Sequence, residues 1–190
     1  MTLPSLLLLA ALIAAPAAPP VTLAIDPARS EIAYTGSSPL HDWTGRSRRA
    51  SGTVTFDPAA PARGARIRVE APVASFDSGS RARDREMRRA TEAARFPTVA
   101  FQATAVQVQR WGAVAGGQGG RWTLSGTLTF HGQTRPLRVE ADVRYGGGVL
   151  TATGSFPVQL SAFGVERPRI VGLPIRDEIT LRFEIVAAPR

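Results

Sequence analysis

The amino-acid sequence predicts an all-β domain, a sandwich or a barrel of about eight or nine strands with one inserted α-helix. Apolar and polar residues alternate along segments 123–130, 137–145 and 179–185, and this period of two gives a strand one dry face and one wet face. The period changes to that of a helix between residues 80 and 95. Glycine clusters separate several strand segments, as they do in hairpin loops. A barrel of such strands can enclose a ligand cavity.

Four strands are predicted in the first part of the chain, namely residues 21–25, 31–37, 52–56 and 66–70. Their ends coincide with turn signals such as Asp57-Pro58, because proline removes a hydrogen-bond donor from the ladder and fixes its own φ angle. Residues 39–45 do not alternate in this way and are predicted to be irregular.

The predicted helix occupies residues 80–95. Met87, Ala90 and Ala94 stand at positions i, i+3 and i+7 and therefore share one helical face. The helix is predicted to close at Phe96-Pro97, because a residue that precedes proline is disfavoured in the helical conformation. Arginines gather towards another face, at positions 81, 85, 88 and 89.

This arginine cluster has two interpretations. A functional helix would bind anionic headgroups or clamp a pyrophosphate, since guanidinium groups match phosphate oxygens in geometry. A structural helix would simply expose the arginines to solvent, with Asp84, Glu86 and Glu92 offsetting part of their charge. The second interpretation is favoured by the pattern.

The second part of the chain predicts five further strands, residues 98–108, 122–130, 135–145, 149–160 and 176–187. Residues 116–120 and 146–148 are predicted to be the hairpin loops between them, because glycine adopts the positive φ angles that tight turns require. Neither glycine cluster joins a strand to a helix, which a phosphate-binding loop would need.

The N-terminal stretch predicts export. Residues 1–17 carry no charged side chain and read as a signal peptide with cleavage near Ala17, which leaves residues 21–188 as one domain. We expect the protein in the periplasm or outside the cell. With no cysteine in the chain, the fold must hold by its core alone.

The net charge of +8 comes from 23 basic residues, all of them arginine. A basic exported protein is attracted to anionic lipid headgroups, so an anionic membrane surface is a predicted partner. Nucleic acid, the other common partner for such charge, is excluded by the expected export.

Few residues could carry catalysis. The chain contains two histidines, His41 and His131. His41 with Asp42 could act as an acid and base pair, but the preferred interpretation is a loop histidine that bonds its neighbours. His131 is predicted to be a turn residue with solvent access. No catalytic residue, metal site or cofactor is predicted, because metal sites normally need three or four ligands. Trp43 and Trp122 are predicted to be core residues rather than ligand contacts.

Three groups of residues resemble the signatures of the YceI-like family of polyisoprenoid-binding proteins. The first group comprises Ser75-Phe76-Asp77-Ser78-Gly79, Arg83-Asp84-Arg85-Glu86-Met87 and residues 95–101 (RFPTVAF). The second is residues 126–137 (GTLTFHGQTRPL), and the third is Phe163-Gly164-Val165. The chain departs from the family pattern at residues 40–45, which are polar, and at Ala162, where a charged residue often stands.

The resemblance implies a lipocalin-like extended antiparallel β-barrel of about eight strands, closed or flanked by the helix. It also implies periplasmic export and a long isoprenoid or other long-chain lipid held in the lumen without catalysis, for envelope transport, storage or stress tolerance. Some family members pair, so a homodimer stays open, although no feature of this sequence requires one.

Alternation then supplies the candidate site residues. The predicted lumen residues are Tyr34, Phe56, Ile67, Val69, Val99, Phe101, Leu124, Leu128, Phe130 and Phe183, and the same alternation adds Val54, Val139, Val143 and Leu181 as lumen or core. The predicted headgroup contacts are Arg85, Arg88, Arg89 and His41.

Two alternatives remain at this point. The barrel could be filled by its own side chains and serve as an envelope stress or interaction protein. Less favoured is an enzyme that uses His41 and Asp42 on a small apolar substrate.

Overall fold

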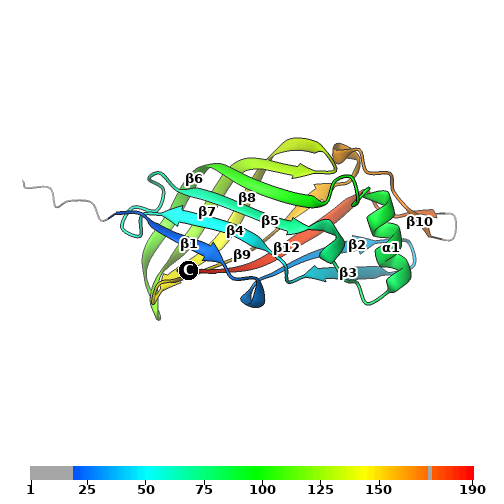
Figure 1. Ribbon diagram of the computed structural model, residues 1–190. Coiled ribbons are helices and arrows are strands. Elements are labelled where there is room, and N and C mark those ends of the chain that lie inside the picture. The colour runs from blue at the N-terminus through cyan, green and yellow to red at the C-terminus, as the bar shows by residue number, and fades with distance from the viewer. Residues whose placement is uncertain (1–18, 171–172) are drawn as a thin grey trace, which may run out of the picture.

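The computed structural model describes residues 19–170 and 173–190. Figure 1 shows an elongated antiparallel barrel, with the helix α1 lying across one of its ends beside β2 and β3. The predicted signal segment, residues 1–17, lies outside the described residues. No described helix combines the length and the apolar character needed to cross a membrane.

In the described part of the chain, eight antiparallel strands close on themselves and confirm the predicted barrel class. Closure occurs where the last strand pairs with the first, with Ala24 opposite Ala188. The eight strands, in ring order, are β1 (Val21–Ile25), β4 (Ser51–Phe56), β5 (Arg66–Pro72), β6 (Thr98–Val114), β7 (Gly117–Phe130), β8 (Gln133–Gly146), β9 (Val149–Gln159) and β12 (Glu178–Ala188).

A hairpin of β2 (Glu31–Ser37) and β3 (Asp42–Ser47) extends the barrel wall from the N-terminal half of β12. The short 3-10 helix Pro27–Arg29 separates it from β1. The prediction that residues 39–45 are irregular was therefore wrong from Asp42 onwards. The strand lacks a simple alternation because a glycine, Gly45, takes an inward position: a Cβ there would lie 2.3 Å from the Tyr34 ring, which covers it from the paired strand.

The hairpin of β6 and β7 is longer than predicted. Its turn is confined to residues 115–116, so most of the predicted glycine loop, residues 116–120, belongs to β7. Glycine is required there by backbone approach: a Cβ on Gly120 would lie 1.6 Å from the carbonyl oxygen of Arg110. Arg110 sits in a β-bulge with a φ angle of 55°, and a bulge brings two residues opposite one.

The helix α1 (Arg81–Ala90) starts one residue later than predicted, because Ser80 is its N-cap, and it ends five residues early, at Ala90 instead of Arg95. Ser80 caps its N-terminus by accepting a hydrogen bond from the Arg83 amide. At the other end Glu92 adopts a left-handed conformation, and the Ala93 amide donates back to the Arg88 carbonyl. This Schellman-type cap ends the helix several residues before Pro97, which was the predicted terminator.

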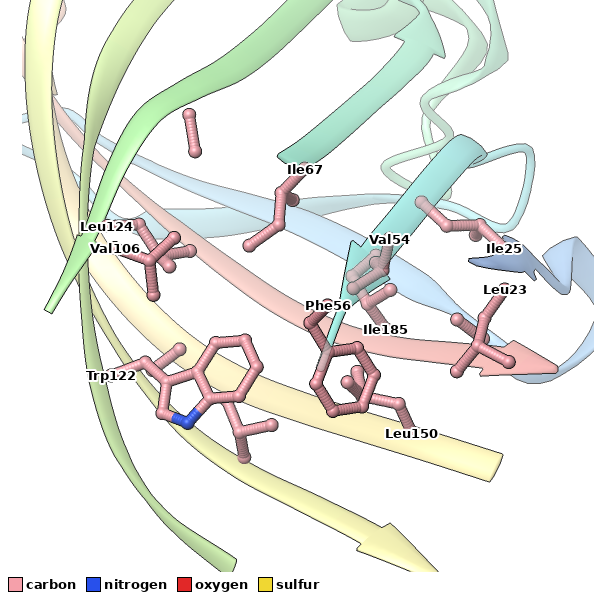
Figure 2. Close-up of a cluster of buried hydrophobic side chains, with 14 of the residues drawn as sticks. Leu23, Ile25, Val54, Phe56, Ile67, Val106, Trp122, Leu124, Leu150 and Ile185 are labelled. Carbon is pink, nitrogen blue, oxygen red and sulfur yellow. The ribbon is translucent and has the colours of Figure 1, made fainter. Parts of the chain in front are cut away.

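Two clusters of buried hydrophobic side chains stabilise the barrel. The first fills the end remote from α1 and includes Leu23, Phe56, Trp122 and Leu150, several of which Figure 2 shows together. The second lies near α1 and includes Ala90, Leu128 and Phe163.

Three short elements near the helix end of the barrel were not predicted. They are the 3-10 helix Ser161–Phe163 and the two-residue strands β10 (Arg169–Ile170) and β11 (Leu173–Pro174). Elements this short carry no detectable hydrophobic period. A further 3-10 helix, Val73–Ser75, leads from β5 towards α1.

Candidate functional site

The barrel encloses a cavity of about 460 Å³, so its interior is not filled by its own side chains. Its wall is formed mainly by aliphatic and aromatic residues from the inward faces of the strands, and α1 contributes residues at one end. A cavity of this size and character suits an apolar ligand.

Most of the predicted lumen residues lie on this wall. They are Tyr34, Ile67, Val69, Val99, Phe101, Leu124, Leu128, Phe130 and Phe183, and Val54, Val139, Val143 and Leu181 lie there too. They share the inner side of the barrel because a β-strand turns every second side chain to the same face.

Phe56 is not among the residues that line the cavity. It is fully buried and packs edge-on against the rings of Trp122, at 5.6 Å, and Tyr145, at 5.1 Å. Figure 2 shows it within the cluster remote from α1. Alternation predicts that a side chain points inwards, but it does not tell whether neighbouring side chains meet at that level of the barrel.

The cavity is long rather than round. Phe130 and Trp122 both line it from β7, eight positions apart, which corresponds to roughly 26 Å along an extended strand. Phe130 lies at the α1 end, next to His131, and Trp122 at the deep end next to Phe56. The shape therefore suits a chain-like molecule better than a compact one.

Aromatic rings surround the end of the cavity beside α1. Tyr34 lies 5.7 Å from Phe76, and Trp43 covers Gly36, where a Cβ would lie 2.6 Å from the indole. Burial raises the pKa of the Tyr34 hydroxyl above its ordinary value, and the nearby Asp84 carboxylate adds to this. The hydroxyl therefore stays neutral and can donate a hydrogen bond at this mouth.

The helix presents Arg83 to the cavity, not the arginines that were predicted to do so. Arg83 lines the wall together with Glu86 and Met87, and its guanidinium lies 5.4 Å from the centre of the Trp43 ring, a cation–π contact. Arg83 stands four residues before Met87, so it shares the apolar face of the helix. That spacing was the signal that could have identified it.

The predicted headgroup residues Arg85, Arg88 and Arg89 do not line the cavity. Arg85 is exposed, and Arg89 donates two hydrogen bonds to the Glu86 carboxylate, at 2.6 and 2.9 Å. These bonds lower the pKa of Glu86 and raise that of Arg89. The helix thus turns most of its arginines to solvent.

His41 does line the mouth of the cavity, where its exposed ring lies 5.9 Å from that of Trp43. Asp42 is exposed and accepts a hydrogen bond from the Ser37 hydroxyl. Among the described residues, no group of three or more histidine, cysteine, aspartate and glutamate side chains could hold a metal ion.

His131 is not the solvent-accessible turn residue that was predicted, because only 10% of its side chain is exposed. Its Nδ1 lies 2.9 Å from the Phe163 carbonyl oxygen, and its Nε2 lies 3.1 Å from the Glu92 carboxylate. A carbonyl can only accept, so Nδ1 carries a proton and donates to it. The imidazole therefore connects the β7–β8 turn to the C-terminal turn of α1.

The residues around His131 come from the three motif groups of the sequence. The Phe96 ring packs edge-on against the imidazole at 5.0 Å, and Phe130 packs against Phe163 at 5.7 Å. Gly132 allows this approach, because a Cβ there would lie 2.5 Å from the Phe96 ring. The motifs that are separate in sequence thus form one cluster that fastens α1 over the cavity.

Hydrogen bonds also hold the segment at Ser161–Phe163. Arg135 donates from Nε to the Ala162 carbonyl at 3.0 Å, and Asp177 accepts from the Ser161 amide at 2.9 Å. Hydrogen bonds from Ser161 lower the pKa of the Asp177 carboxyl. The backbone of Ala162 is therefore anchored although its side chain is not charged.

Replacing His131 with alanine is expected to destabilise the fold by about 1–3 kcal/mol, because the carbonyl of Phe163 and the carboxylate of Glu92 would each lose a partner. Hydrogen exchange should rise most in residues 81–96. His41→Ala is the matched control, since His41 is exposed, and should change stability little. Equal effects of the two substitutions would contradict the fastening role.

Comparison with known proteins places this geometry among related folds. A crystal structure of Burkholderia cenocepacia BcnA superposes with a TM-score of 0.72 at 26% identity, covering 86% of this chain and 99% of that one. A polyisoprenoid binding domain from Saccharophagus degradans, implicated in plant cell wall breakdown, superposes with a TM-score of 0.69 at 15% identity, covering 88% of this chain and 98% of that one.

The chain also resembles known proteins in sequence. UPF0312 proteins of Vibrio cholerae are 29% identical over 130 residues, a match that spans 64% of this chain and 64% of the relatives, which is less than two thirds of their length. The model of the YceI-like domain matches residues 23–187.

Proposed function

This chain belongs to the YceI-like domain family, and we propose that it binds a long apolar lipid of the polyisoprenoid class in its barrel, without catalysing a reaction. The observation that carries the proposal is the elongated apolar cavity of about 460 Å³. The polyisoprenoid class is suggested by the Saccharophagus degradans domain, which is described as polyisoprenoid binding.

Burial of hydrocarbon supplies the affinity. Each methylene that leaves water contributes about 0.8 kcal/mol, so a chain of several isoprene units is held strongly against release into water. Relative to a bilayer the gain is small, because lipid tails are as apolar as the cavity wall. The protein can therefore load and unload at a membrane while it holds its cargo in between.

The end of the barrel beside α1 is the proposed entrance. Leu40, in the turn between β2 and β3, is 65% exposed, and the arginines at positions 81, 85 and 89 are exposed on the helix. An exposed leucine on the β2–β3 hairpin and exposed cations on the neighbouring helix (Figure 1) suit an anionic lipid surface, which attracts arginine and accepts an apolar side chain. A bacterial envelope, reached through the expected export, is the proposed location, and transport, storage or stress tolerance is the proposed role.

Lipid extraction tests this proposal. Protein stripped of lipid is incubated with vesicles that contain a long-chain polyprenol, separated from them, extracted with organic solvent and analysed by mass spectrometry. We expect stoichiometric polyprenol, taken up faster from anionic than from neutral vesicles, with a difference that high salt removes. Protein that returns empty from both kinds of vesicle would contradict the proposal and favour an envelope interaction protein.

A further inference from the structure

The end of the cavity remote from α1 is closed by apolar side chains. Trp122, Val143 and Leu150 line the cavity there, and each of these residues is only 1–2% exposed. Nearer α1, the lining rings of Phe101 and Phe183 are only half-buried. The open space therefore narrows along the barrel and ends at Trp122, Val143 and Leu150, which we call the floor of the cavity.

A second layer of side chains lies behind the floor. Phe56 is fully buried, does not line the cavity and packs against the Trp122 ring at 5.6 Å, as Figure 2 shows. Trp111 packs against Trp122 at 5.5 Å, and its own ring is held by a hydrogen bond of 2.9 Å from Nε1 to the Pro58 carbonyl oxygen. Trp111 and Tyr145 do not line the cavity and are partly exposed to solvent. A lipid chain that reaches Trp122 therefore has no space beyond it.

The floor presents hydrocarbon to a ligand. The side chains of Val143 and Leu150 are aliphatic, and the one polar atom of the Trp122 side chain, Nε1, is itself buried. The charged lining residues of α1, Arg83 and Glu86, stand at the opposite end of the cavity. A polar group at the floor would lose its hydrogen bonds to water without replacement. The hydrocarbon end of a lipid therefore points towards the floor, and its polar end points towards α1.

We infer that Trp122 limits the length of the lipid chain that the barrel carries, because the tail stops against its ring while the polar end stays near α1. The inference rests on the proposed lipid-binding function and adds a specificity for chain length. Isoprene units inside the cavity have nearly the same free energy as in a bilayer, whereas each unit that protrudes exposes its hydrocarbon to water. The amount of lipid that the protein removes from a membrane should therefore fall by at least about tenfold for each unit beyond the limit.

A series of polyprenols that differ by one isoprene unit tests the inference. Each polyprenol is offered in vesicles to protein stripped of lipid, the protein is separated from the vesicles, and lipid per protein is measured by mass spectrometry. Wild-type protein should take up chains to one length and little of any longer chain. Trp122→Leu removes about as much volume from the floor as one isoprene unit occupies, so it should extend the limit by about one unit.

A second variant moves the limit in the opposite direction without removing packed atoms. Ala152 lines the cavity beside the floor, since it lies opposite Val143 on one neighbouring strand and Ile185 on the other. Ala152→Leu should therefore shorten the limit. Thr151→Leu is the matched control, because Thr151 does not line the cavity and its side chain points to the other face of β9. This substitution should leave the limit unchanged.

Thermal denaturation shows which variants are folded, and Ala152→Leu decides alone if Trp122→Leu does not fold. A limit that stays at the wild-type length in either folded variant, or a wild-type load that does not fall with chain length, would overturn the inference. Wild-type protein that takes up no polyprenol of any length would instead contradict the proposed function.

Discussion

Replacing Leu128 with arginine is expected to abolish lipid retention. Leu128 is 4% exposed, lines the cavity and lies opposite Phe101 in the β6–β7 pair. A guanidinium at this position would enter an apolar space without a carboxylate partner, and an unpaired buried charge costs several kcal/mol. The cation must either draw water into the barrel or displace the wall, and a hydrocarbon chain no longer binds in either case.

The control for this prediction is the same substitution one residue further along β7. Thr129 is exposed, and its hydroxyl bonds that of Thr134 on the outer face. Thr129→Arg should retain lipid and cost less than about 1 kcal/mol of stability. Lipid per protein is measured by mass spectrometry after vesicle loading, and folding by thermal denaturation.

Because Leu128→Arg can fail to fold, a variant without added charge keeps the prediction testable. Ala141 is 1% exposed and lines the cavity from β8, so Ala141→Phe should fill part of the space with apolar atoms. We expect a folded protein with a reduced lipid load. A folded Leu128→Arg or Ala141→Phe protein that carries the wild-type amount of lipid would show that the cargo does not occupy this cavity.

Phe56→Ala is expected to cause the second large effect, a loss of about 3–5 kcal/mol in the free energy of unfolding. Phe56 is completely buried and joins β4 to Trp122 and Tyr145 through ring contacts. Truncation removes these contacts in the cluster next to the point where β1 pairs with β12 and β4. Chemical denaturation measures the change.

Phe101→Ala provides the comparison for Phe56→Ala. The Phe101 side chain is half-buried and already borders the cavity, so its removal widens an existing space and deletes fewer packed contacts. We expect a smaller loss of stability than for Phe56→Ala but a clearer change in which lipids are retained. If Phe101→Ala lost more stability than Phe56→Ala, this would contradict the conclusion that Phe56 lies in a packed part of the barrel and Phe101 beside a cavity.

Much of this architecture could be predicted from the sequence, for reasons that individual elements make clear. Segment 137–145 alternates without interruption, and in the structure Val139, Ala141 and Val143 are buried while the residues between them are exposed. The β2–β3 hairpin was missed from Asp42 onwards because glycines replace apolar residues on its inner face. An aromatic ring on the neighbouring strand covers each of those glycines. The alternation of residues within one segment does not reveal such a contact with another strand.

The candidate site likewise has features that the sequence predicts and features that it does not. The inward direction of Leu124 or Phe183 follows from the period of a strand, whereas Phe56 has the same direction but meets other rings instead of open space. The arginines of α1 were all visible in the sequence, but the rotation of the helix against the barrel turned Arg83 towards the cavity and Arg85 and Arg89 towards solvent.

The sequence by itself determined that this protein is an all-β domain with an inserted helix, because strand period, turn residues and helix period are local properties of the chain. Only the tertiary structure decided that the strands close into a barrel with an elongated hollow, that His131 fastens the helix above it, and that Phe56 packs against other rings instead of bordering it. These features depend on the distances between side chains that lie far apart in the sequence. Such distances are set by strand register and barrel closure, which no single segment encodes.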